Sequence, residues 1–192
     1  MNFADIDFQV GSVNPSGIAQ LGYYIPKADI ASWPTIDDDP ESADATIAGI
    51  STYSTDFVLD TGKIWKHIYS TSGKGKVTFE GTGETDCKMY LNKATLSYPR
   101  ITDDIRAFAK AAVNGDFVFV IKHDGKYFVI GHPDYRTTVT PGGDTGDAAG
   151  SAKGVTIELE CPDVTPMPRY SGELVITEGS LDCDTDVITA GT

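Results

Sequence analysis

The sequence has few of the residues that build covalent or metal-linked frameworks. It contains three cysteines in 192 residues, Cys87, Cys161 and Cys183, and no CxxC pair. An odd, widely spaced set of cysteines argues against a disulfide framework and against a zinc module. No apolar run approaches the roughly 20 residues of a membrane helix, and the acidic start is unlike a signal peptide. We therefore expect a soluble chain, made in a reducing cytoplasm, without a membrane segment.

Positive charge is also scarce. The chain has 15 Lys and Arg residues against 28 Asp and Glu residues, a formal net charge of −13 and a pI near 4.4. Contacts with phosphate groups need a cationic patch, so specific nucleic-acid binding is not expected. An acidic surface still has a physical effect beside DNA, because it repels the phosphates.

Catalytic and metal motifs are missing. The sequence has no GxSxG, P-loop, HExxH or dinucleotide fingerprint. His123 and His132 both fall in the stretch Ile121–Pro133, but an Asp124-Gly125 turn would place them at opposite ends of a hairpin, ~20 Å apart at ~3.3 Å per residue. His67 alternates with Trp65 and Tyr69, which favours a half-buried strand histidine without a partner. We expect no enzyme, no cofactor and no metal.

The pattern of apolar residues predicts a mainly β fold. Twenty glycines and ten prolines favour short strands and turns. One helix is predicted, from Thr102 as N-cap to Val113, with an apolar stripe along one side. The rest fits a single-domain antiparallel β-sandwich or barrel over residues 1–192. Strands are predicted at Asn2–Val10, Gly17–Ile25, Thr55–Asp60, Lys63–Ser70, Lys76–Gly81, Cys87–Pro99, Val155–Val164 and Gly172–Gly179.

The hairpin at residues 117–132 is predicted to be apolar on both faces. With the two-residue turn, Phe119 pairs with Ile130 and Ile121 pairs with Phe128. One face then carries Phe117, Phe119, Ile121, Phe128 and Ile130. The other carries Val118, Val120, Tyr127 and Val129, and either a further layer of the chain or another subunit must cover it.

Two long polar segments complete the chain. One is an acidic arm at about residues 31–49, and the other is a Gly-rich loop at about residues 140–154. Neither can bury itself, which is typical of assembly subunits. The acidic run lacks the ligand spacing of a calcium loop, so a solvated arm is favoured. The candidates for contact between subunits, or for lining a channel, are Asp37, Asp38, Asp39, Glu41, Asp44, Val118, Val120 and Val129.

The order of these segments resembles that of bacteriophage tail tube proteins and their relatives in contractile injection machines. In that comparison ITDDIRAFAKAAVNGD is the flanking helix and ASWPTIDDDPESADATIAG is the arm. The residue pattern of NGDFVFVIKHDGKYFVIG, followed by GVTIELECPDVTPMPRYSG, is also similar to that of phage virion proteins. The resemblance spans most of the chain, but it includes no short invariant motif, so no single residue is assigned a role by it.

The resemblance implies a structural virion protein assembled in the bacterial host cytoplasm. Six copies would form a ring, and stacked rings would form a tube through which DNA passes without specific binding. Other tail or neck proteins would be its partners. A negative channel wall would keep the genome from adhering.

Three alternatives remain open from the sequence. The first is another ring-forming virion protein, namely a tail terminator, connector or collar. The second is a carbohydrate-binding β-sandwich module, suggested by Trp65, Tyr69 and Tyr90. The third is an enzyme with a pocket of converging acids.

Overall fold

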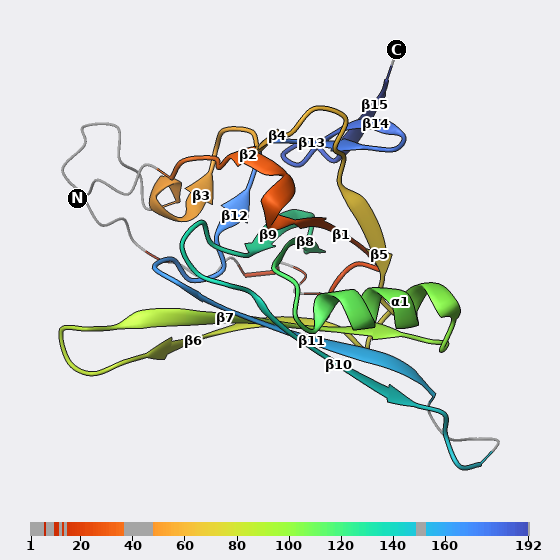
Figure 1. Ribbon diagram of the computed structural model, residues 1–192. Coiled ribbons are helices and arrows are strands. Elements are labelled where there is room, and N and C mark those ends of the chain that lie inside the picture. The colour runs from red at the N-terminus through yellow and green to blue at the C-terminus, as the bar shows by residue number, and fades with distance from the viewer. Residues whose placement is uncertain are drawn as a thin grey trace.

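The computed structural model describes residues 6, 10–11, 13, 15–36, 48–148 and 153–191 and is mainly β, with one α-helix (Figure 1). Four sheets are present in these ranges, and none of them closes into a barrel. The predicted mainly antiparallel β fold with one flanking helix is confirmed, in a sandwich-like form.

A six-stranded sheet forms the middle layer, in the order β3-β12-β9-β8-β1-β5. All its neighbours are antiparallel except β12 and β3, which are parallel. Its strands are β1 (Leu21–Pro26), β3 (Thr52–Tyr53), β5 (Lys66–Tyr69), β8 (Phe117–His123), β9 (Lys126–Ile130) and β12 (Arg169–Tyr170).

Three smaller sheets accompany it. The four-stranded sheet has the order β10-β11-β7-β6 and the three-stranded sheet β13-β14-β15, while β2 pairs with β4. The four-stranded sheet contains β6 (Lys76–Thr82), β7 (Met89–Tyr98), β10 (Thr138–Asp144) and β11 (Gly154–Asp163). The others contain β2 (Ile30–Ser32), β4 (Val58–Leu59), β13 (Glu173–Ile176), β14 (Gly179–Asp182) and β15 (Val187–Ala190); two 3-10 turns lie at Lys27–Asp29 and Gly49–Ser51.

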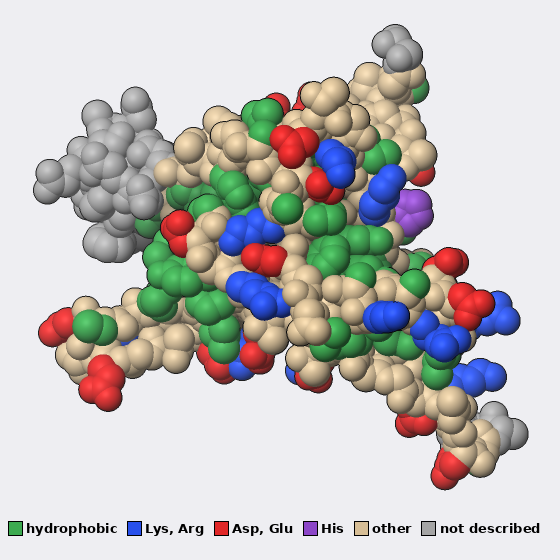
Figure 2. Space-filling view, in the orientation of Figure 1, with side chains coloured by type: hydrophobic (Ala, Val, Ile, Leu, Met, Phe, Trp, Pro, Cys, Tyr) green, Lys and Arg blue, Asp and Glu red, His purple; other side chains and the backbone are tan. Residues whose placement is uncertain are grey.

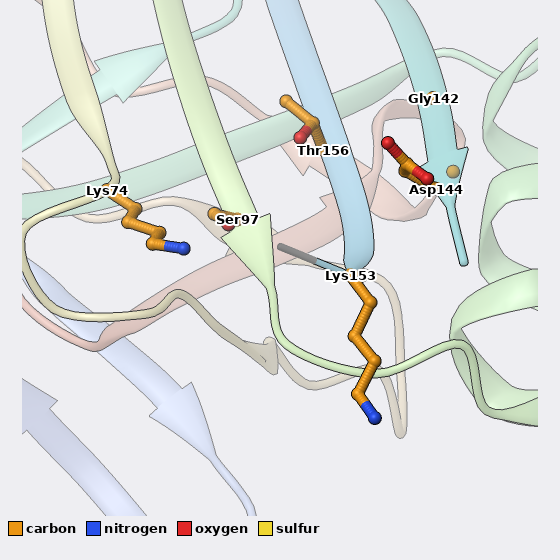
Figure 3. Close-up of a pocket in the computed structure, with 8 residues that line it drawn as sticks. Lys74, Ser97, Gly142, Asp144, Lys153 and Thr156 are labelled. Atoms are coloured by element: carbon orange, nitrogen blue, oxygen red, sulfur yellow. The ribbon is translucent and has the colours of Figure 1, made fainter. Parts of the chain in front are cut away.

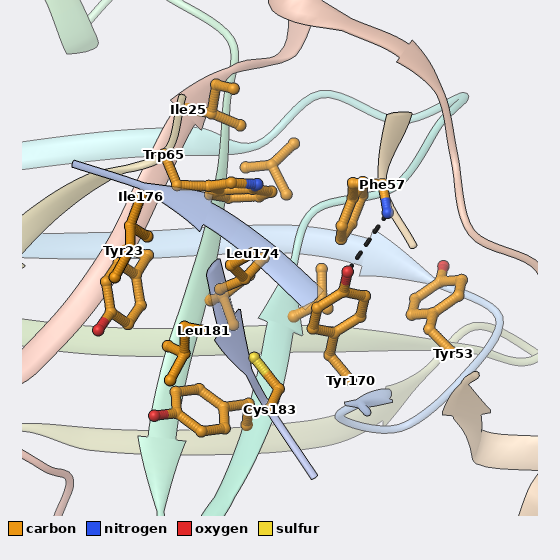
Figure 4. Close-up of a cluster of buried hydrophobic side chains, with 14 residues drawn as sticks. Tyr23, Ile25, Tyr53, Phe57, Trp65, Tyr170, Leu174, Ile176, Leu181 and Cys183 are labelled. Carbon is orange, nitrogen blue, oxygen red and sulfur yellow. Dashed lines mark hydrogen bonds between the residues drawn. The ribbon is translucent and has the colours of Figure 1, made fainter. Parts of the chain in front are cut away.

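The six-stranded sheet has a hydrophobic core on each face. One core lies against the four-stranded sheet and α1 (Asp103–Ala112), and includes Phe119, Ile130, Leu96 and Ile157. The other lies against the three-stranded sheet (Figure 4) and is built around Trp65, with Leu174 and Leu181 from β13 and β14. Burial of apolar surface at ~25 cal/mol per Å² makes these two cores the main source of stability.

The β8–β9 hairpin separates the two cores and has the predicted register. Phe119 pairs with Ile130, and Ile121 pairs with Phe128, around an Asp124-Gly125 turn whose two residues both have positive φ. Phe117, Phe119, Ile121 and Ile130 pack into one core and Val118, Val120, Tyr127 and Val129 into the other, while Phe128 is half-buried. The prediction that both faces are covered is therefore confirmed.

The proposal that the valine face contacts another subunit is wrong. Val118, Val120 and Val129 are all 0% exposed within the chain. They pack in the Trp65 core, where β13 and β14 supply the covering layer. These three residues belong to the protein's own interior.

The helix begins and ends as predicted. Thr102 is the N-cap, and its Oγ1 accepts a hydrogen bond from Ile105 N at 3.5 Å. Asp103 and Asp104 occupy the first turn, where the helix dipole favours negative charge. Ile105 and Ala112 are buried against the sheets.

Several predicted boundaries differ from the structure. Residues 138–144, expected to lie partly in a Gly-rich loop, form strand β10, because Val139 pairs with Leu159 and is buried. The predicted strand at Thr55–Asp60 shrinks to β4. Of the polar arm, residues 31–36 and 48–49 are described, while residues 37–47 and most of the predicted strand Asn2–Val10 lie outside the described residues.

Candidate functional site: the open face and edges of the four-stranded sheet

Within the described part of the chain, no layer covers one face of the four-stranded sheet. In the view of Figure 1 it forms the bottom layer, with α1 and the other sheets above it. Along β11, buried Val155, Ile157 and Leu159 alternate with exposed Thr156 and Glu158. By the same alternation the outer face is rich in threonine and charge: Lys76, Thr78, Glu80, Thr82, Lys93, Thr95, Ser97, Thr138, Thr140, Thr156, Glu158 and Glu160. Half-buried Met89, Leu91 and Pro162 are its apolar members, toward the β6–β7 hairpin.

Charges on this face are organised around one lysine. Lys93 Nζ lies 2.6 Å from Glu80 Oε1 and 3.5 Å from Glu160 Oε1, on the strands to either side. The hydrogen bond to Glu80 is the main cause that raises the pKa of Lys93. Cross-strand pairs of opposite charge stabilise neighbouring strands. With Glu158 added, the acids of the face outnumber its lysines, Lys76 and Lys93.

Both edges of this sheet are open. Among the described residues, no strand pairs with the outer edge of β6 or of β10. The four strands alternate in direction, so β6 and β10 run antiparallel to each other, and each is seven residues long. Unpaired edges are ready templates for pairing with another chain.

Pro141 identifies which groups of β10 face outward. Proline occurs in sheets on edge strands with its nitrogen side away from the ladder, and Pro141 pairs with Ile157 across β11. By the same periodicity, the N–H groups of Val139 and Gly143 point away from β11. They are donors available to a further strand.

A hollow lies at one end of this sheet (Figure 3). It has a volume of about 570 Å³ and is lined by two cations, Lys74 and Lys153, one acid, Asp144, and the backbone of Gly142, Gly143 and Gly154, with Ser97 and Thr156. No histidine or cysteine is among the described residues that line it. With two lysines against one aspartate, the lining is a polar surface with an excess of positive charge.

One buried carboxylate lies under the same sheet. Asp163 is 1% exposed, and burial raises its pKa, although the hydrogen bonds to it act in the opposite direction. Its oxygens accept hydrogen bonds from Thr165 N and Asn92 Nδ2. A carboxylate held in this way fixes the connection between β11 and β12.

The three histidines have different surroundings. His67 is exposed on β5, while Trp65 precedes the strand and is buried, so the predicted half-buried histidine is not found. His123 contacts Gly17 O through Nδ1. His132 is buried, accepts a hydrogen bond from Asp134 N and packs on Tyr135. Within the described ranges, no group of three His, Cys, Asp or Glu residues is placed to hold a metal ion.

The aromatic residues suggested for carbohydrate binding do not form a platform. Trp65 is 1% exposed and packs edge-on against Phe57, with 5.2 Å between the ring centroids. Tyr90 instead packs on Phe79, in the projecting β6–β7 hairpin. Tyr69 lies beside Tyr98. The three aromatics are therefore divided among a core, a hairpin arm and a sheet edge.

The structure does not describe the acids that the sequence proposed as contact or channel residues. Asp37, Asp38, Asp39, Glu41 and Asp44 lie outside the described residues. The structure instead exposes Glu80, Glu158 and Glu160, which the sequence analysis missed. The signal was present in the run VTIELEC, where acids alternate strictly with buried apolar residues.

The chain matches no family model, no curated protein and no solved structure. No helix in the described part of the chain is long and apolar enough to cross a membrane.

Proposed function

We propose that this protein is a structural subunit that assembles side by side into a ring, as the resemblance to phage tail tube proteins implies. The observation that carries the proposal is the pair of open, oppositely directed edges on the four-stranded sheet. When copies are related by rotation about an axis, β6 of one copy meets β10 of the next in antiparallel orientation. A single type of contact then uses both edges of every copy, which is the requirement for a closed cyclic assembly.

The position of the other sheets and of α1 determines which face of the four-stranded sheet would line such a ring. The inner face of the four-stranded sheet carries a core, α1 and the other sheets. Only the uncovered face, with its threonines and the Glu80–Lys93–Glu160 group, can turn toward the axis without a clash. Six copies, the number that the resemblance implies, would give a 24-stranded barrel. Barrels of roughly 16–18 strands already enclose an aqueous channel.

The chemistry of the uncovered face suits the passage of DNA. Hydroxyl groups and an excess of carboxylates offer no cationic patch to hold phosphates. The chain as a whole carries a formal charge of −13, so long-range repulsion acts in the same sense. This supports a channel for DNA in a virion, assembled in the host cytoplasm, with other tail or neck proteins as partners and no catalysis.

A tail terminator, connector or collar protein is the second candidate. It would use the same lateral edges but present one ring face to a different partner. The open edges favour all ring-forming proteins equally.

Electron microscopy and solution mass test the proposal. Purified protein at increasing concentration should give rings or tubes in negative stain, together with a mass that is a multiple of 20.5 kDa. A monomer that persists at all concentrations, with no particles above monomer size, would contradict it.

A further inference from the structure

The two ends of the four-stranded sheet carry unpaired charges of opposite sign. At one end, the β6–β7 hairpin projects beyond the described strands of the six-stranded sheet, and its tip spans residues 83–88 (Figure 1). Glu84 and Asp86 at the tip are exposed and have no ion-pair partner among the described residues. Lys88 is the only cation in this tip. Glu80, on β6 behind the tip, forms an ion pair with Lys93.

The tip is an ordered turn that presents its acids in a fixed way. Cys87 N donates to Glu84 O at 3.1 Å. Gly83 has φ +102°, and a Cβ there would lie 2.3 Å from Cys87 O, so only glycine fits. Behind the tip, Phe79 is 53% exposed and packs on Tyr90. The hairpin thus combines two acids with an incompletely covered aromatic pair.

The opposite end of the same sheet is cationic and hollow. The 570 Å³ hollow with Lys74 and Lys153 adjoins a second of about 280 Å³, which is lined by Arg100, Ile101 and again Lys153. Within the described ranges, none of these three cations has an ion-pair partner. Asp144 is the acid that lines the larger hollow, and its Oδ1 accepts a hydrogen bond from Gly146 N. Figure 2 shows acidic side chains at the hairpin tip, while on the opposite side of the molecule several Lys and Arg side chains lie together with acidic ones.

The two ends cannot meet within one copy. β7 joins them and is ten residues long, which corresponds to about 30 Å at ~3.3 Å per residue. We infer that the β6–β7 tip of one copy docks into the cationic hollow of a second copy, along the strand direction. Glu84 and Asp86 would approach Lys74, Arg100 and Lys153, and the glycine backbone of the hollow leaves room for the turn.

This contact joins unlike surfaces, so it is heterologous, and because it runs along the strand direction rather than around the ring axis it does not close on itself. Repetition along one axis gives an open-ended stack. It rests on the proposed ring function and deepens it, because every ring would carry tips on one side and hollows on the other. A subunit with both complementary ends suits a repeating tube rather than a terminator, connector or collar.

Charge reversal tests the contact. The double variant Glu84→Lys/Asp86→Lys and the double variant Lys74→Glu/Lys153→Glu should each lose stacks in electron micrographs while single rings persist. Combining all four substitutions should restore stacks, because the attraction is then reversed but intact. The control Asp134→Lys/Glu178→Lys changes exposed acids elsewhere and should stack normally. Normal stacking by either reversed double variant, or failure of the fourfold variant to recover, would overturn the inference.

Cross-linking separates this contact from ring formation. Cys87 is the exposed cysteine at the tip, so Lys74→Cys or Lys153→Cys adds the partner thiol. Oxidation should give a ladder of dimers, trimers and larger species on denaturing gels, whereas the wild type should stop at dimers. Glu178→Cys is the matched control and should give no repeating ladder from tip contacts. A ladder without rings would support the end contact and reject the ring proposal. Rings without a ladder would support the ring proposal and reject the end contact.

Discussion

Asn92 on β7 and Asp163 on β11 form a buried pair in which Asn92 Nδ2 donates to Asp163 Oδ2 at 3.3 Å. The same Asn92 donates to Thr165 O at 2.9 Å and accepts a hydrogen bond from Met167 N at 2.9 Å. One amide therefore holds the chain between β11 and β12 in place, including Met167, whose φ is positive.

Removing this amide should weaken the fold in a pH-dependent way. Asn92→Leu leaves a buried carboxylate with fewer donors, at a cost of about 1–3 kcal/mol near neutral pH. Burial already raises the pKa of Asp163, so its favourable contribution is full below the unfolded value of 3.8 and declines as pH rises through the folded pKa. Loss of a donor raises that pKa further. Urea unfolding should show a larger deficit for the variant at neutral than at acid pH; an equal deficit at both would contradict this account.

Thiol chemistry should distinguish the three cysteines. Cys87 is exposed, whereas Cys161 and Cys183 are buried. Burial raises the pKa of Cys161 to about 12 and also raises the pKa of Cys183, so both stay protonated and inaccessible. Maleimide should label one site per native chain and three in denaturant, measured by intact mass. Cys87→Ser should abolish native labelling; residual labelling of that variant would show that a core opens readily.

Charges introduced on either face of the β8–β9 hairpin should prevent folding. Val118→Asp and Phe119→Asp point into different cores, and both side chains are 0% exposed. Each buries an unpaired charge, which costs about 3–5 kcal/mol. Lys126→Asp, at an exposed position on the same hairpin, is the control. Circular dichroism and soluble yield give the readout, and a folded Val118→Asp protein would contradict the two-core arrangement.

Proline at the β10 edge should separate folding from assembly. Gly143→Pro removes a donor that points away from β11, and a Cβ there would come no closer than 3.9 Å to its neighbours. We expect a near-normal melting temperature with loss of rings. Gly142→Pro instead removes a donor to β11 and should destabilise the monomer. If Gly143→Pro assembles fully, the β10 edge is not the lateral contact.

Neutralising the acids of the open face should make an assembled channel retain DNA. Glu80→Gln, Glu158→Gln and Glu160→Gln together leave Lys76 and Lys93 without opposing charge on that face. Binding of short duplex DNA to rings should appear at about 50 mM salt and fade by about 200 mM, because counterion release governs such contacts. Asp134→Asn/Glu178→Gln is the control. No retention by the triple variant at low salt would argue against these acids lining the channel.

The sequence predicted best what short-range chemistry determines. The cap at Thr102 and the turn at Asp124-Gly125 fix the helix start and the hairpin register through neighbouring residues alone. The same turn determines which residues share a face, so both cores were foreseeable from that hairpin.

Long-range pairing and edge positions were not predictable in the same way. The parallel pairing of Tyr170 with Tyr53 joins residues more than a hundred positions apart, and no local pattern encodes it. Strand β10 was read partly as loop because Pro141 and two glycines are turn residues in isolation, yet an edge strand tolerates them. The alternation of Glu158 and Glu160 with buried residues marks one polar side of β11, but it does not determine whether another layer covers that side.

The two-core arrangement also affects synthesis of the chain. The β8–β9 hairpin needs only its own turn to form, which takes about 1–10 μs. Leu174 and Leu181, which cover its valine face, come about 50 residues after Ile130. At roughly 5–20 residues per second, the ribosome needs several seconds to add them. During that interval newly made chains carry an uncovered apolar ribbon, so slower expression at lower temperature should reduce aggregation of nascent subunits.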